Sequence, residues 1–195
     1  MNASTQFTLR FRPGLRLTDR VFGKLCAANP ELKLERTARE ELVVVPTGSE
    51  TAMRNAAVTA QVVYWAEVDG SGVAFDSSAG FTLPNGAIRS PDSSWITRVR
   101  WRALPREQRD QFAPLCPDFV VELRSDADRK AKLRKKMREY IAQGARLGWL
   151  IDLVDGKVEI YRPGQPAEVL EQPTTLSGED VLPGFVLDMK GILSD

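Results

Sequence analysis

A glutamate inside an apolar strand pattern is the clearest sign of chemistry in this 195-residue sequence. The stretch 117–125 reads as a buried β-strand whose apolar side chains alternate with Glu122 and Arg124 on the opposite face. Carboxylates are rarely buried without a partner. Glu122 therefore indicates either a metal ion or a cationic side chain beside it, and both interpretations stay open at this point.

Two Pro-Asp pairs offer a second carboxylate for Glu122. Asp118 lies on the same strand and face, but at a rise of ~3.3 Å per residue it is ~13 Å away, too far to share an ion. Asp92 follows a hairpin signal at Asn85-Gly86, so a neighbouring strand could present it beside Glu122. We predict that Asp92 is the partner and that Asp118 is structural.

Apolar periodicity and turn residues predict the elements that position these acids. The central one is a strongly basic helix from about Asp128 to Gln143, directly after the strand of Glu122. A hairpin over 81–89 should continue as a strand through 90–96. An earlier helix, opening at Gly48-Ser49, carries a predicted buried stripe of Ala52, Met53, Ala56, Ala57, Ala60, Val63 and Tyr64. Further segments are a helix over 18–28 and strand pairs over 32–45 and 148–162.

These elements predict an α+β fold with a mixed β-sheet flanked by α-helices and with N- and C-terminal hairpins. A composition of 43% hydrophobic and 27% charged residues suits one domain over residues 1–195. No segment reaches the ~18 apolar residues of a membrane helix. The first residues lack the apolar core of a secretory signal, so we expect a cytoplasmic protein. Two distant cysteines are more typical of buried thiols than of a disulfide.

The sequence contains no histidine. That absence excludes Ser-His-Asp and Cys-His catalysis as well as zinc held by histidine. The remaining chemistry must use carboxylates, lysines, hydroxyls and bound ions. Hard oxygen ligands favour Mg²⁺ or Mn²⁺.

Several short motifs, in order, resemble the Uma2 family of restriction endonucleases within the PD-(D/E)XK nuclease superfamily. They are Arg-Ser-Pro-Asp at 89–92, Val-Val-Glu-Leu-x-Ser at 120–125, Lys-x-x-x-Tyr at 136–140, Gly144 and Trp-Leu-Ile-Asp at 149–152. Leu-Glu at 34–35 and Leu-Pro-Gly-Phe at 182–185 extend the resemblance over nearly all of the chain.

The resemblance implies a restriction-endonuclease-like fold and a site for Mg²⁺. Asp92 and Glu122 would bind the ion, the carbonyl of Leu123 would be a third ligand, and Glu35 would be an additional one. A bound divalent ion lowers the pKa of its water and offsets charge on a phosphate. For Glu35, a surface charge on the first hairpin is the alternative interpretation.

A lysine two residues after the glutamate is usual in this superfamily, but here the position holds Arg124. Arginine stays protonated, so it stabilises charge but is a poor base. Lys136 is the natural substitute, with Tyr140 and Ser125 supporting the site. The alternatives are a solvated lysine at 136 and a salt-bridge partner at 124.

The expected substrate is DNA. Seven basic residues between 129 and 138 could contact phosphates, with Arg129, Lys130 and Lys132 as candidates. Cations on every side of a helix also suit a simply solvated helix. The sequence thus predicts a Mg²⁺-dependent DNA endonuclease, although Arg124, Asp126 and Lys132 depart from the family pattern. Two alternatives remain: a nuclease-like module that binds DNA or protein without cleaving, and a homodimeric structural protein.

Overall fold

The computed structural model describes residues 6–11, 15–45, 48–126 and 128–193. Its helices are α1 (Asp19–Ala28), α2 (Ser49–Asp69), α3 (Arg98–Ala103), α4 (Arg106–Arg109) and α5 (Lys130–Ala142). Its strands are β1 (Phe7–Leu9), β2 (Lys33–Arg36), β3 (Leu42–Val45), β4 (Gly72–Asp76), β5 (Phe81–Thr82), β6 (Ile88–Arg89), β7 (Ser93–Thr97), β8 (Phe119–Arg124), β9 (Leu147–Asp152), β10 (Lys157–Tyr161), β11 (Glu168–Glu171), β12 (Thr175–Ser177) and β13 (Val186–Asp188).

The central sheet has six strands in the order β11-β10-β9-β8-β7-β4. Adjacent strands of this sheet pair antiparallel, with the exception of β8 and β9. These two run parallel, with Phe119 opposite Leu147 and Arg124 opposite Asp152. A parallel pair needs a crossover connection, and α5 supplies it. The predicted α+β fold with mixed sheets and helices is therefore confirmed.

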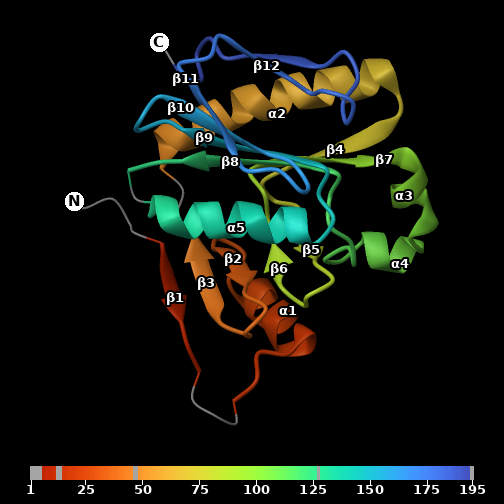
Figure 1. Ribbon diagram of the computed structural model, residues 1–195. Coiled ribbons are helices and arrows are strands. Elements are labelled where there is room, and N and C mark those ends of the chain that lie inside the picture. The colour runs from red at the N-terminus through yellow and green to blue at the C-terminus, as the bar shows by residue number, and fades with distance from the viewer. Residues whose placement is uncertain (1–5, 12–14, 46–47, 127, 194–195) are drawn as a thin grey trace.

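The two faces of the central sheet are covered by different helices (Figure 1). Phe119, Val121 and Leu123 of β8 join a buried cluster with Val58 and Val62 of α2. Val120 instead packs in a second cluster with Leu133, Met137 and Tyr140 of α5. Because strand side chains alternate, Glu122 shares the face of Val120 and lies under α5.

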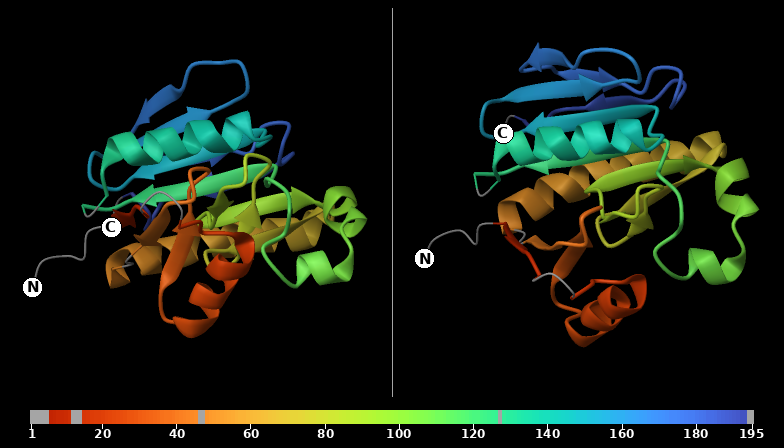
Figure 2. Two further views of the ribbon diagram at one scale, coloured as in Figure 1. Left: turned by 90° about the horizontal axis from the view of Figure 1, so that it is seen from below. Right: turned by 60° about the horizontal axis from the view of Figure 1, so that its bottom comes forward.

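A second sheet, in the order β1-β3-β2-β6-β5, lies beside α5 on the face of the central sheet that α5 covers (Figure 1 and Figure 2). The predicted N-terminal hairpin is its β2–β3 pair, with Glu35 opposite Val43. A small third sheet pairs β12 with β13 near the C-terminal end of the described chain. Side chains of both sheets meet at α5, where Lys136 contacts Glu35 of β2 and Glu122 of β8.

The strand predicted over 88–96 is broken. β6 belongs to the N-terminal sheet and β7 to the central sheet, so residues 90–92 cross from one to the other. Pro91 has no N–H to donate to a continuous ladder. The backbone N–H of Asp92 instead donates to the carbonyl of Val121, at 3.0 Å. This break carries Asp92 to the edge of β8 beside Glu122.

The predicted buried stripe of α2 is wrong. Met53 and Tyr64, placed inside by the prediction, are 57% and 73% exposed, whereas Val58, Val62 and Ala66 are buried. Apolar residues lie on several sides of this helix, so periodicity could not identify the face that packs. The buried face is the one that packs against the central sheet.

Cys26 and Cys116 are both free thiols. Within the described ranges, no helix is both long and apolar enough to cross a membrane.

Candidate active site between the two sheets

Glu122 is buried between β8 and α5, and two side chains of α5 bind the same oxygen. The ammonium of Lys136 lies 2.7 Å from Glu122 Oε1, and the Tyr140 hydroxyl donates to that oxygen at 2.9 Å. Lys136 and Tyr140 are one helical turn apart, so both point to one spot on the strand below. None of the hydrogen bonds described for the chain reaches Glu122 Oε2.

Glu35 of β2 holds Lys136 from the opposite side. Its Oε1 lies 2.7 Å from the Lys136 ammonium and accepts from the Ser90 N–H at 3.0 Å. Its Oε2 is 3.1 Å from the Arg89 guanidinium. Burial alone would raise the pKa of Glu35, but Lys136, Arg89 and Lys33 outweigh it and lower the pKa to about 2. Glu35 is therefore an ionised anchor whose two oxygens are both engaged.

Asp92 is fixed by one contact from each sheet. Its Oδ2 accepts from the Leu123 backbone N–H at 2.9 Å, and its Oδ1 lies 2.9 Å from the ammonium of Lys33 on β2. Sequence reasoning missed Lys33. The available signal was its spacing from Glu35, because residues two apart on a strand share a face.

Charge in this cluster does not cancel. Four carboxylates, Glu35, Asp92, Glu122 and Glu139, face three cations, Lys33, Arg89 and Lys136. Burial raises the pKa of Glu122 to about 7, with Asp92 and Glu35 adding to the rise against the pull of Lys136. Burial would lower the pKa of Lys136, but Glu122 and Glu35 raise it. The raised pKa favours the ammonium form of Lys136, beside a carboxylate that favours another cation.

A cavity of about 40 Å³ opens between these groups, lined among others by Lys33, Asp92, Glu122, Leu123 and Lys136. That volume is of the order of one or two waters. In the described part of the chain, no three Asp, Glu, Cys or His side chains group closely enough to form a ready metal cage. The carboxylate oxygens of the cavity still suit Mg²⁺, because this ion keeps several of its waters and needs only one or two carboxylate ligands from the protein. Asp92 and Glu122 would hold it.

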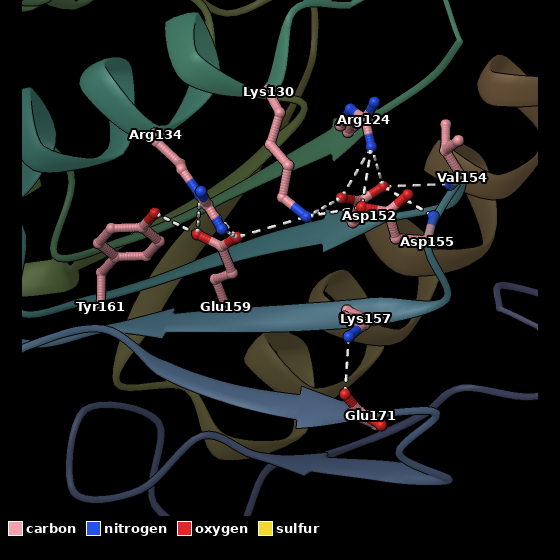
Figure 3. A network of polar contacts seen from close by, with 10 residues as sticks. All are labelled: Arg124, Lys130, Arg134, Asp152, Val154, Asp155, Lys157, Glu159, Tyr161 and Glu171. Carbon is pink, nitrogen blue, oxygen red and sulfur yellow. Dashed lines mark hydrogen bonds and ion pairs between the residues drawn. The ribbon is translucent and has the colours of Figure 1, made fainter.

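Arg124 does not line this cavity and points to Asp152 instead (Figure 3). Its guanidinium lies 2.8 Å from Asp152 Oδ1, at the end of the adjacent parallel strand β9, and 3.5 Å from Asp155. Ser125 lines the cavity, but its hydroxyl donates to Asp128 at 2.7 Å. The cations that reach the carboxylate pair are thus Lys33 and Lys136.

A family model described as "Putative restriction endonuclease" and named Uma2 matches residues 21–190. The chain belongs to the Uma2 family. A solved structure from Anabaena variabilis, titled as a putative nuclease belonging to DUF820, superimposes with a TM-score of 0.69 at 21% sequence identity, covering 82% of this chain and 89% of that one. That likeness supports the fold alone. No curated protein matches the sequence.

The Uma2 match contains every residue of the cavity's charged cluster, and it also contains α5. Three cations of this helix are engaged within the protein: Lys130 with Asp152 and Asp155, Arg134 with Glu159, and Lys136 as described (Figure 3). Arg129 and Lys132 are exposed. Of the three phosphate contacts predicted from the sequence, Lys130 is therefore occupied and the other two are accessible.

Proposed function

We propose that this protein is a Mg²⁺-dependent endonuclease that hydrolyses phosphodiester bonds of DNA. One observation carries the proposal: Asp92, Glu122 and Leu123, which come from two separate parts of the sequence, line one cavity together with two lysines. Hard oxygen donors beside ammonium groups suit an ion and a phosphate in contact. Mn²⁺ would fit the same donors.

When bound, the ion would lower the pKa of an attacking water and offset charge on the scissile phosphate. The protein's own side chains supply the rest. Lys136 is held by Glu35 at 2.7 Å, and the neighbouring carboxylates raise its pKa, so it suits donation to a phosphate oxygen better than acceptance of a proton. Lys33 binds only Asp92 among the described carboxylates and its side chain is 17% exposed, so it can shift toward a substrate. We therefore assign charge stabilisation to Lys136, assisted by Lys33, and no catalytic role to Arg124.

A plasmid-nicking assay with Mg²⁺ or Mn²⁺ tests this proposal. The wild-type protein should convert supercoiled plasmid to the nicked form, and D92A or E122A should reduce the rate by about 10²- to 10³-fold, as for loss of an essential electrostatic group. D118N is the matched control, because Asp118 is also a buried acid at β8 but binds Arg100, at 2.7 Å, away from the cavity. Nicking that survives in both D92A and E122A would refute the proposal.

A non-cleaving DNA-binding module is the second candidate. It is favoured by the missing lysine at position 124 and by the pairing of Asp92 and Glu122 with lysines that already supply positive charge. For such a module, the affinity for DNA would be equal with and without Mg²⁺, and no divalent ion would give cleavage.

A further inference from the structure

A second and larger cavity, of about 840 Å³, lies away from the carboxylate pair. Side chains of α1, β5, β6, α3 and α4 line it, and α1 and α4 lie on the same side of the central sheet (Figure 2). Ile88 of β6 faces this cavity, whereas its neighbour Arg89 reaches Glu35. Because strand side chains alternate, the two cavities lie on opposite faces of β6. The larger one is a separate site.

Aromatic side chains form one part of its wall. Phe75 and Trp101 meet edge to face with ring centroids 4.9 Å apart, and Phe112 packs against Phe22 at 5.4 Å. The guanidinium of Arg109 lies 5.9 Å from the centre of the Trp101 ring. Such a wall, rings beside a planar cation, suits stacking of a flat ligand.

In the part of the chain that the structure describes, two acids and two arginines line this cavity, and only the acids have ion-pair partners. Asp19 is paired with Arg36 at 2.5 Å, and Asp110 lies 3.7 Å from Arg106. Arg36 and Arg106 do not line the cavity. The cations that do line it are Arg20 and Arg109, and no ion pair is found for either within the described residues. Aromatic rings beside two guanidinium groups without ion pairs suit an anion that has a flat apolar part.

Arg109 is one of the two guanidinium groups that an anion in the cavity could bind. Its Nε is buried and has no acceptor among the described atoms. Arginine presents its N–H groups in a fork that fits phosphate or carboxylate oxygens. The proposed nuclease function selects the phosphate.

We propose that this cavity binds a single nucleotide unit, its base against the wall of Trp101 and Phe75 and its phosphate on Arg20 and Arg109. The volume lies in the range of pockets that enclose small molecules. The choice of a nucleotide over other flat anions rests on the proposed nuclease function. The unit has two sources, a free mononucleotide or an unpaired nucleotide of a DNA strand.

Calorimetric titration of the intact E122A protein in the presence of a chelator tests the proposal without cleavage. The probes are deoxyadenosine monophosphate, deoxyadenosine, inorganic phosphate, a short single-stranded oligo-dA and a blunt duplex. The monophosphate should bind more tightly than the nucleoside or phosphate, because each of these offers only half of the contacts. Tighter binding of oligo-dA than of the monophosphate and the duplex would assign the site to an unpaired nucleotide in a strand, and the reverse order would assign it to a free nucleotide.

Variants R109Q and R20Q should each weaken binding of the preferred probe about tenfold, the effect of one charge-assisted phosphate contact. R102Q is the matched control, because Arg102 is exposed on α3 and does not line the cavity. Equal binding by R109Q and R102Q, or no preference for the monophosphate over phosphate, would overturn the proposal. The nicking assay is independent: nucleotide binding without nicking would refute only the nuclease, and nicking without nucleotide binding would refute only this site.

Discussion

Each acidic side chain of the site is defined by the cation that it binds. Lys136 bridges Glu35 and Glu122, and Lys33 binds Asp92. Buried ion pairs contribute little net stability, but removal of one partner leaves an uncompensated charge and is costly. Mutations of single members should therefore affect both folding and chemistry, and the two effects must be measured separately.

Replacement of Glu35 by glutamine is the sharpest test of this arrangement. The variant leaves Lys136 and Arg89 with less negative charge, and we expect the free energy of unfolding to fall by about 3 kcal/mol. Urea denaturation measures it. E171Q is the control, because Glu171 is largely exposed and solvent screens its pair with Lys157, so this substitution should change stability little. Equal losses in the two variants would show that Glu35 is not an anchor.

Arg124 differs from the residues of the cavity because it binds Asp152. We expect R124M to lower the free energy of unfolding by about 3 kcal/mol, since Asp152 is fully buried and loses one of its cations. The nicking rate per folded molecule should stay near the wild-type value. If the folded variant instead lost most of its nicking activity, a catalytic role for Arg124 would be restored and our assignment to Lys136 would need revision.

At the scale of elements, α5 combines three tasks. Its inner face packs Leu133, Met137 and Tyr140 against the central sheet, and Lys136 extends from that face to the carboxylates. One flank pairs Lys130 and Arg134 with acids of the β9–β10 hairpin (Figure 3). Under the proposed function, the cations of α5 that remain accessible to DNA are the exposed ones, which include Arg129 and Lys132.

This division predicts different effects of two neighbouring lysines on DNA binding. K132Q should weaken affinity for any DNA sequence and reduce the slope of log affinity against log salt by about one. K130Q should change that slope much less, because the Lys130 ammonium is within 2.8 Å of both Asp152 and Asp155. Fluorescence anisotropy of labelled duplex with the E122A protein, over a salt series, measures both. An equal change in slope would contradict the division.

At the scale of the whole molecule, the network on the central sheet makes stability depend on pH. Burial would raise the pKa values of Asp152 and Glu159, but hydrogen bonds from Lys130 and Arg124 to the first and from Arg134 and Tyr161 to the second lower both. A carboxyl whose pKa is lower in the folded state binds fewer protons there than in the unfolded chain. Its contribution is present above the ordinary pKa and is lost as pH falls through the folded value.

The expected result is a free energy of unfolding that declines steadily from about pH 5 downward, as carboxylates with lowered pKa values become protonated. E159Q should flatten this decline, because it removes one of the titrating groups. Denaturation at a series of pH values measures it. E107Q is the control, since Glu107 lies exposed on α4. A decline of the same slope in E159Q and wild type would show that Glu159 does not contribute.

Local sequence pattern was sufficient to predict part of the candidate site. The alternation of β8 indicated that Glu122 and Val121 face opposite ways, and the turn at Asn85-Gly86 indicated a hairpin that would bring Asp92 close. Histidine is absent from the whole chain, so the prediction of a hard metal ion followed from composition. These inferences depend on short-range geometry, which a strand or turn imposes regardless of what packs on it.

The tertiary structure decided the pairings. Lys33 and Glu35 reach the site only because the N-terminal sheet lies against α5, and Arg124 is diverted because a parallel strand ends with Asp152 beside it. The buried face of α2 was likewise chosen by the sheet that it covers. Each of these contacts joins residues that lie far apart along the chain. Packing and charge together determine which of several possible partners a side chain binds. Periodicity along the sequence carries no information about that choice.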